Sequence, residues 1–335
     1  MQKKDLGLLV LILVVGTIVA LINPRFLSPI NLANTANLVG LFGLFAIGQG
    51  FVIITGGIEL SVGSVIALLG VLFVSLVADG MFWPVVAILM LALGVLIGLA
   101  HGFLITQMGM QPFIVTLCGL LIYRGVARFY TADATAGFVF GQSFPELEWL
   151  TVGRSFGIPN SFIAMLVIAA VMWVVLHRSV FGRYLYAVGR NEEAARYAGV
   201  RTGGVIVAAY VICAVLTALA ASFFAMYTRS ISPASHGSFY ELYAIAAAVL
   251  GGFSLRGGEG SIVGVVLGAV LLQVLQNLVN LLGIPSSLNF AVMGSVILIG
   301  VLADQQFDAY RRRRAMAATP QEPAVRSKLG SEAGL

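Results

Sequence analysis

The stretch HRSVFGRYLYAVGRNEEAARYAGVR, residues 177–201, is a polar island in an otherwise apolar chain, and we call it the polar segment. It holds five arginines, and no long apolar run crosses it. Asn191 is a good helix N-cap, the two glutamates after it favour a helix N-terminus, and Gly199 suits the left-handed position that follows a helix. These signals predict a helix of about two turns, with Glu192 and Arg196 on one face.

The composition of the 335-residue chain excludes a soluble globular protein. Hydrophobic residues make up 59% of it and charged residues 10%, with a mean hydropathy of +1.00, whereas soluble domains carry about 25% charged residues. Its 39 glycines fit membrane helices that pack closely together. Cys118 and Cys213 lie in apolar runs, so we expect buried thiols rather than a disulfide framework.

About ten apolar segments are long enough, or nearly long enough, to cross a membrane, which takes about 20 residues. They lie near residues 6–22, 37–55, 60–78, 83–105, 112–130, 160–176, 204–226, 242–255, 261–282 and 287–303. The eighth is the shortest and fits a short or re-entrant helix as well as a full crossing. The sequence predicts an all-α polytopic membrane protein, with one transmembrane domain over residues 1–305 and a basic, disordered tail over residues 306–335.

The net charge of +5 indicates membrane topology rather than nucleic-acid binding, because the basic residues lie between apolar runs and in the tail. With the N-terminus inside, fourteen of the nineteen basic residues fall in cytoplasmic segments and three fall outside. The residues after Ile22 form no signal-peptide cleavage site, so we expect the first span to be retained. Both termini and the polar segment are expected in the cytoplasm, and the loop 131–160 is expected to form a cap or docking surface outside.

Two glycine-rich stretches are similar to each other. Residues 52–72 read VIITGGIELSVGSVIALLGVL, and residues 249–267 read VLGGFSLRGGEGSIVGVVL. In each, apolar residues lead into Gly-Gly, and a serine precedes a new apolar run. Duplicated segments of this kind, in which glycines interrupt a helix, point to the pathway of a transporter. The alternative is that glycine turns recur by chance in a chain so rich in glycine.

The first of these stretches is a candidate hinge or pathway. Glycine frees the backbone to leave a helix, and an acid that faces lipid is costly, so Glu59 should face a partner, a cavity or the cytoplasmic edge. Three interpretations are open: a structural hinge, a direct part in gating or substrate passage, and a plain loop whose acid lies in water. The residues concerned are Gly56, Gly57, Glu59, Ser61 and Gly63.

A second candidate pathway lies on the ninth segment. Gln273, Gln276 and Asn280 follow one another at i, i+3 and i+7 and so share one helix face. A polar stripe of this kind forms either a hydrophilic pathway or hydrogen bonds between helices. Arg124 and Arg128 also share a face, near the outer end of the fifth segment, where snorkelling is the simplest interpretation.

No catalytic or metal site is readable in the sequence. The three histidines are far apart, and no Ser-His-Asp arrangement or nucleophile elbow occurs. A Walker A loop is excluded, because Lys3, Lys4 and Lys328 are the lysines of the chain and none follows the required glycine pattern. If the protein works against a gradient, its nucleotide site lies on another chain.

These motifs resemble the permease subunits of bacterial ABC importers. EAARYAG at residues 193–199 matches the E-A-A-x-x-x-G cytoplasmic loop of those subunits. GGIELSVGS at 56–64, FGRYLYAVGRNEEAARYAGV at 181–200 and ELYAIAAAVLGGFSLRGGEGSIVG at 241–264 are similar to the branch that imports ribose, xylose and autoinducer-2. The resemblance extends over residues 6–303. Glu59 departs from it, because aspartate is usual at that position.

The resemblance implies an inner-membrane protein that pairs with a second permease, identical or related, and binds two ABC ATPase domains, often fused in one polypeptide. A periplasmic binding protein would deliver a monosaccharide or a related small polar solute. ATP and Mg would bind to the ATPase, and this chain would bind no cofactor. Within the loop 177–203, residues 182–199 would form the coupling helix. The coupling residues would be Gly182, Arg183, Gly189, Asn191, Glu192, Glu193, Ala194, Ala195, Arg196 and Gly199.

Two other classes of protein are open at this point. An ion-coupled secondary transporter would act without an ATPase and would use a buried acid as a relay, for which Glu59 is nearly the only candidate. A membrane receptor or scaffold would use the polar segment only to dock a partner. In an importer, the polar segment would transmit the movement of a partner protein to the membrane part. In a receptor or scaffold, it would only anchor the partner.

Overall fold

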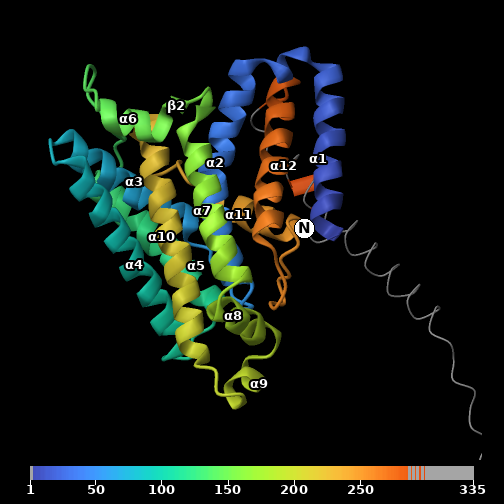
Figure 1. The fold of residues 1–335 in the computed structure, drawn as a ribbon. Helices are drawn as coiled ribbons and strands as arrows, with labels where there is room; N and C mark the ends of the chain where they lie inside the picture. The colour runs from blue at the N-terminus through green and yellow to red at the C-terminus, as the bar shows by residue number, and fades with distance from the viewer. Residues whose placement is uncertain (1–2, 286–287, 289–290, 292–293, 296–297, 299–335) are drawn as a thin grey trace, which may run out of the picture. The chain divides into compact units, whose positions relative to one another are not determined.

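Helices form nearly all of the regular structure in the computed structural model (Figure 1), which describes residues 3–285 together with residues 288, 291, 294, 295 and 298. Within these residues, seven helices are long and apolar enough to cross a membrane. They are α1 (Lys3–Ile22), α2 (Pro29–Ile53), α4 (Trp83–Thr106), α5 (Pro112–Tyr130), α7 (Asn160–His177), α10 (Thr202–Thr228) and α12 (Ile262–Leu281). Two shorter apolar helices are α3 (Val62–Ala78) and α11 (Tyr240–Leu250). The chain is an all-α polytopic membrane protein, as the sequence predicts.

The remaining elements are short and lie in the connections. The helical ones are η1 (Pro24–Leu27), α6 (Pro145–Val152), α8 (Val180–Arg190) and α9 (Glu192–Tyr197). The strands are β1 (Ala136–Gly137), β2 (Arg154–Ser155), β3 (Ile158–Pro159) and β4 (Ser230–Ile231). β1 pairs antiparallel with β4, and β2 pairs antiparallel with β3.

The first nine predicted segments each correspond to a helix. The tenth, 287–303, lies almost entirely outside the described residues, and the tail 306–335 lies wholly outside them. α2 begins at Pro29 rather than near residue 37, because Ser28 caps the backbone N–H of Asn31 and proline suits the first turn. α11 has 11 residues, which span about 16 Å and cannot cross a membrane. The interpretation of the eighth segment as a short helix is therefore correct.

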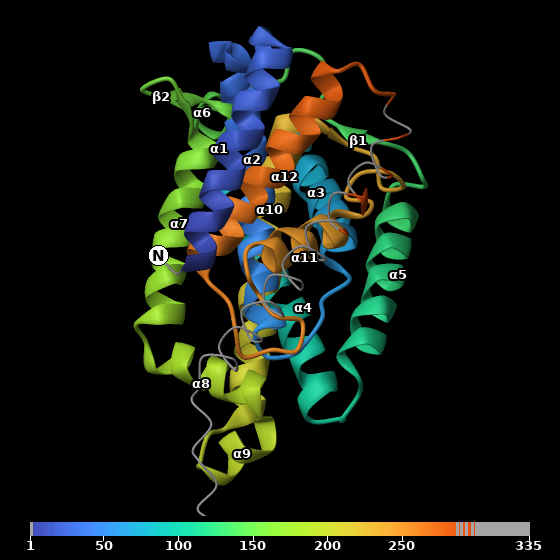
Figure 2. The ribbon, with the colours of Figure 1, turned by 90° about the vertical axis from the view of Figure 1, so that its right-hand side faces the viewer.

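α10 packs closely against α4 and α2 and lies at the centre of the helix packing (Figures 1 and 2). On α4, Gly94, Gly98 and Gly102 follow at intervals of four and face α10. A Cβ on Gly98 would lie 2.5 Å from the Cα of Val211, and one on Gly102 would lie 2.8 Å from the Cα of Val207. Small residues at this spacing let two membrane helices approach through their backbones. Figure 2 shows the short helices α3 and α11 between α12 and α5.

The outer faces of α1, α4, α5 and α7 expose large apolar side chains, as expected of surfaces that contact lipid or a further membrane subunit. The two cysteines differ in this respect. Cys213 is buried on α10, as predicted, but Cys118 is exposed on α5. The prediction of a buried Cys118 is wrong because α5 presents an apolar face outward rather than to the core.

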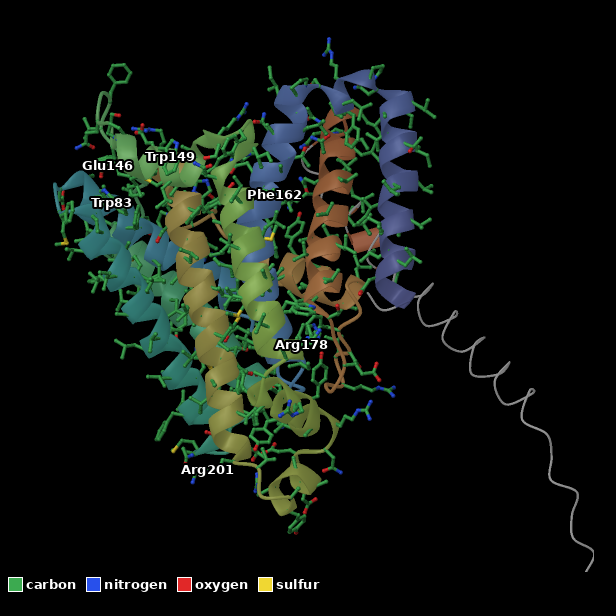
Figure 3. All side chains as sticks on the ribbon, in the orientation of Figure 1. Trp83, Glu146, Trp149, Phe162, Arg178 and Arg201 are labelled. Atoms are coloured by element: carbon green, nitrogen blue, oxygen red, sulfur yellow. The ribbon has the colours of Figure 1, made fainter. Side chains whose placement is uncertain are left out.

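Different residues mark the two ends of the helices (Figure 3). Trp83, Glu146 and Trp149 lie at one end, near α6, and Arg178 and Arg201 lie at the other, near α8 and α9. Tryptophan is enriched at membrane interfaces, and arginine is enriched in the loops of one side. We call the end that holds α8 and α9 the basic end.

Candidate functional site

The predicted helix of the polar segment is α9, which lies at the basic end next to α8 (Figures 1 and 2). The Oδ1 of Asn191 accepts a hydrogen bond of 2.9 Å from the backbone N–H of Ala194, and Gly199 has a φ of +84°. Arg196 and Glu192 form an ion pair of 2.8 Å along the exposed face. The cap, the C-terminal glycine and the shared face are therefore confirmed.

A second helix, α8, precedes α9, so the structure divides the stretch 182–199, which the resemblance implies to be one coupling helix, between two helices. Ser179 caps it, since its Oγ accepts a hydrogen bond of 3.0 Å from the backbone N–H of Gly182. Gly182, Leu185 and Val188 form its buried face. This cap and this spacing were readable signals, but the arginines and glycines between them conceal the pattern. Asn191 ends α8 and begins α9, so the two helices share one residue.

Most of the predicted coupling residues are exposed at the basic end. The exposed ones are Arg183, Asn191, Glu192, Glu193, Ala194, Arg196 and Gly199. Gly182 and Ala195 are buried, and Gly189 is partly buried. The polar segment thus offers a polar outer surface, and two of its glycines, Gly182 and Gly189, lie in close backbone contact with the rest of the molecule.

Gly189 of α8 lies where the two glycine-rich loops meet. We call residues 54–61 the first glycine loop and residues 251–261 the second glycine loop. The backbone N–H of Gly258 donates a hydrogen bond of 2.8 Å to the carbonyl of Ile54, which joins the two loops. A Cβ on Gly189 would overlap that carbonyl oxygen and the nitrogen of Gly258. We call this meeting point of three backbones the glycine junction.

Gly257 and Gly258 allow the second glycine loop to enter the junction. Both have positive φ, +83° and +73°, a conformation that L side chains rarely adopt. A Cβ on Gly257 would lie 2.7 Å from the carbonyl oxygen of Gly189 and 2.8 Å from the nitrogen of Gly56. The junction therefore depends on glycine in all three segments.

Tyr186 holds α8 to the second glycine loop through a chain of hydrogen bonds. Its hydroxyl lies 2.9 Å from the carbonyl of Gly260 and 3.2 Å from Nδ1 of His177. The backbone N–H of Ile262 donates to Nε2 of the same histidine at 3.3 Å. With Nε2 as acceptor, Nδ1 carries the proton and donates to Tyr186, whose own proton is directed at Gly260. Burial raises the pKa of Tyr186 to about 12, which keeps its hydroxyl a donor.

The first glycine loop is held by a different set of contacts. Glu59 is buried, and its Oε1 accepts hydrogen bonds from the backbone N–H and the hydroxyl of Ser61, at 2.7 and 2.6 Å. Its Oε2 lies 2.7 Å from Nδ1 of His101 on α4, whose Nε2 lies 2.9 Å from the hydroxyl of Tyr123 on α5. The interpretation of a plain loop with its acid in water is wrong, because Glu59 is buried and its carboxylate is hydrogen-bonded to His101 of α4.

Two close approaches complete the surroundings of this loop. Gly57 leaves space for the hydroxyl of Tyr210, which donates to the carbonyl of Ile58 at 3.1 Å. Gly63 is in backbone contact with Gly237, so a Cβ on either residue would overlap the carbonyl oxygen of the other. The start of α3 therefore packs directly on the loop that precedes α11.

Arg124 contacts the loop that precedes α11, and the prediction that it snorkels is wrong. Its Nη1 donates to the carbonyls of Pro233 and His236, at 2.8 and 2.6 Å. The guanidinium is turned inward and is not snorkelling along the helix. Arg128 does reach the end of α5, where it pairs with Asp133 at 2.5 Å. Sequence spacing put both arginines on one face, but it could not show that free carbonyls lie beside only one of them.

The polar stripe of α12 lines a cavity of about 330 Å³. Gln273, Gln276 and Asn280 all face it, together with aromatic residues of α2, α10 and α11. Within the described residues, these three side chains form no hydrogen bond with another helix. The bond between helices on α12 is made instead by Asn277, which exchanges amide hydrogen bonds of 2.8 and 3.0 Å with Asn31.

Among the residues that the structure describes, no three His, Cys, Asp or Glu side chains are placed to hold a metal ion. His101, Tyr123 and Tyr186 are functional candidates that sequence reasoning did not connect to the glycine loops. Their partners Glu59, His101 and Gly260 lie 42, 22 and 74 residues away, so no local signal could have found them.

Comparisons with known proteins identify the family of the chain. Residues 31–301 match the family described as the permease component of branched-chain amino acid transport systems. The chain is 40% identical to the ribose import permease protein RbsC of Bacillus subtilis 168, over 92% of this chain and 94% of that protein. It is 38% identical to RbsC of Escherichia coli K12, over 91% and 94%. It is 34% identical to the galactofuranose transporter permease protein YtfT of the same strain, over 84% and 80%.

No solved structure matches the chain. The family match spans most of the sequence, and the relatives are covered almost from end to end. The matched region contains the polar segment, both glycine loops and the helices from α3 to α12, together with nearly all of α2, whereas α1 lies before it. The chain therefore belongs to the permease-component family of the branched-chain amino acid transport systems.

Proposed function

We propose that this chain is the permease subunit of an ABC importer in the bacterial inner membrane, and that it forms a pathway for a monosaccharide or a related small polar solute. Family membership supports a transport component, and the relatives named above are named for ribose and galactofuranose. A further relative, 33% identical over 76% of this chain and 72% of its own length, is named the fructose import permease protein FruF of Bifidobacterium longum.

The glycine junction carries this proposal. An ATPase that binds the exposed side of α9 moves α8 with it, because Asn191 belongs to both helices. α8 contacts both glycine loops through Gly189 and is hydrogen-bonded to the second loop through Tyr186, so its displacement shifts the connection from α11 to α12 relative to the end of α2. Hydrolysis of ATP with Mg on the partner would supply the energy. The predicted coupling residues thus move as one unit, and Gly189 is where this unit contacts the glycine loops.

Further partners follow from this proposal. A periplasmic binding protein docks at the end opposite the basic end, where α6 and the loops around it expose Phe140, Trp149 and Phe156. The permease pairs with a second permease copy or a related chain through an exposed apolar helix face. Both termini and the polar segment lie in the cytoplasm, in agreement with the arginines at the basic end.

The ion-coupled alternative places its relay on Glu59. Both oxygens of this carboxylate already have close hydrogen-bond partners, and the side chain is buried. A relay acid must exchange its partners with water or an ion during each cycle. The contacts of Glu59 fit a structural hinge better. A direct test is the purified chain alone in liposomes: sugar accumulation driven by a proton or sodium gradient would support the alternative.

The main test is uptake in the source organism. We expect deletion of the gene for this chain to abolish uptake of radiolabelled ribose or fructose, and the wild-type gene to restore it in an ATP-dependent manner. Radiolabelled leucine is the control, because the family description names branched-chain amino acids. Loss of leucine uptake with intact sugar uptake would contradict the proposed substrate class. Unchanged uptake of all three would overturn the proposed function.

A further inference from the structure

The cavity beside α12 combines three amides with an aromatic floor. The amides are those of Gln273, Gln276 and Asn280. On the other side, the ring of Phe42 on α2 lies 4.8 Å from that of Tyr240 and 5.9 Å from that of Tyr243, both on α11. Small-molecule sites are typically lined by apolar and aromatic side chains with a few polar groups, in volumes of about 300–1,000 Å³. At about 330 Å³, the cavity suits one small ring.

The aromatic floor is fixed by its surroundings. The ring of Tyr240 also contacts Phe45, at 5.9 Å, and Phe224, at 5.6 Å. Aromatic rings packed in this way from α2, α10 and α11 have little freedom to turn. A flat and rigid floor of this kind is suited to the face of a ligand ring.

The amides form a graded series along α12. Gln273 is buried, Gln276 is half-buried and Asn280 is exposed. Seven residues separate the first from the last, a rise of about 10 Å along the helix. Since the three form no hydrogen bond with another helix among the described residues, their donors and acceptors are available for a ligand at successive depths.

The absence of charged side chains in the lining indicates the class of ligand. None of the ten residues that line the cavity is charged. A zwitterionic amino acid would have to leave water without an ionic partner there, which is costly. A neutral sugar presents hydroxyls to the amides at its edge and C–H groups to the aromatic rings at its face. The lining therefore favours a neutral polyhydroxylated ring over an amino acid.

We propose that this cavity is the site at which the permease itself holds the sugar ring during passage, with Gln273 and Gln276 as hydrogen-bonding residues and Tyr243 as a stacking residue. This inference rests on the proposed function and specifies its contact residues. Asn280 would meet the solute first, and Gln273 would hold it deepest in the helix bundle.

The test uses the complete importer in proteoliposomes, with ATP inside, its binding protein outside and radiolabelled ribose or fructose, whichever the wild type imports. Gln273→Met and Gln276→Met remove the amide and keep the length of the side chain. Leu282→Met, at the C-cap of the same helix, is the control, because Leu282 does not line the cavity. We expect sugar uptake to fall about tenfold in the two glutamine variants, the effect of about one lost hydrogen bond, and to stay at the wild-type level in the control.

ATP hydrolysis separates this inference from the proposed function. We expect ATPase activity stimulated by the binding protein to stay within about twofold of wild type in the glutamine variants, because coupling at the basic end is intact. If both glutamine variants import sugar at the wild-type rate, the proposed site is overturned but the importer assignment stands. No ATP-dependent uptake by the wild type would overturn the assignment itself.

A labelling experiment covers the case in which a methionine variant fails to fold. In a Cys118→Ser background, Gln276→Cys and the control Leu282→Cys are exposed to a small charged methanethiosulfonate reagent. We expect sugar-loaded binding protein with ATP to slow modification at position 276 and to leave position 282 unchanged. Equal rates at position 276 with and without the sugar would contradict occupation of the cavity.

Discussion

The two glycine loops have similar sequences but are fastened to different parts of the molecule. The first follows α2 and is held by Glu59, through His101 and Tyr123, to the membrane helices α4 and α5. The second follows α11 and is held by Tyr186 to α8 of the polar segment. A single backbone hydrogen bond, from Gly258 to Ile54, joins them.

This difference assigns the loops different roles. The first glycine loop belongs with the membrane scaffold, because buried polar contacts tie it to two long helices. The second belongs with the polar segment and follows α8 when a partner moves it. Movement at the basic end would therefore shift the second loop, with α11 and α12, relative to the first. The cavity lies between α11, α12 and α2, so that shift would reshape it.

The largest effect is expected from Gly189→Val. The added side chain overlaps the Ile54 carbonyl and the Gly258 nitrogen, so α8 must separate from both loops. Overpacking of this kind typically costs about 1–3 kcal/mol, and here it removes the contact that transmits movement. We expect uptake to fall to the level of the deletion strain with normal amounts of protein in the membrane. Gly204→Val is the matched control, since no atom lies within 4 Å of its Cβ position; equal uptake by both variants would contradict the junction.

Glu59→Gln tests the fastening of the first loop. Loss of the charged partner of His101 should cost about 1–3 kcal/mol and lower the Tm of the purified permease. His101→Leu should do the same, and the double variant should lose less than the sum, because both remove one interaction. The measurement is thermal unfolding of the four proteins in one detergent. Strict additivity would show that the two residues act independently.

Tyr186→Phe tests the fastening of the second loop and should affect transport more than stability. It removes the hydroxyl between Gly260 and His177, a net loss of about 1 kcal/mol. We expect uptake per ATP hydrolysed to fall several-fold. Tyr184→Phe on the same helix is the control, because that side chain is 42% exposed. If both variants behave alike, Tyr186 does not link α8 to the loop.

Gly199→Val should have the smallest effect on transport of the four substitutions, because Gly199 contacts neither glycine loop. It has a φ of +84° with no atom near its Cβ position, so Gly199→Val suffers backbone strain alone, about 1–2 kcal/mol. We expect reduced uptake from fraying of α9, and near-normal uptake from Gly199→Asn, since asparagine tolerates this conformation. The comparison is made at equal membrane levels of both variants. An equal loss of uptake in both variants would contradict this account, because it would show that any side chain at position 199 is harmful, whatever its backbone preference.

Local signals predicted much of the fold and part of the site. Nine apolar segments, the cap of α9 at Asn191 and the stripe from Gln273 to Asn280 were readable, because hydropathy, capping and helix spacing act over a few residues. α8 was missed, since arginines and glycines break up its apolar face. Cys118 was misplaced because an apolar run does not reveal which side faces the core.

The remaining site could not be read from the sequence because it depends on distant contacts. Glu59 was expected to need a partner, but His101 could be identified only once α4 lay beside the first loop. The inward turn of Arg124 depends on the carbonyls of a loop more than a hundred residues away. The aromatic floor of the cavity requires α11 to begin inside the bundle, which a hydropathy pattern cannot locate.

The central claim is that the second glycine loop moves with α8 and away from α4 and α5. Pulsed electron spin resonance of the complete importer tests this with spin labels in a Cys118→Ser, Cys213→Ala background. One pair joins Tyr184→Cys on α8 to Glu259→Cys in the second loop, and the other joins Met108→Cys, between α4 and α5, to Glu259→Cys. With ATP, we expect the first distance to stay constant and the second to change. A constant second distance with a changed first distance would contradict the account.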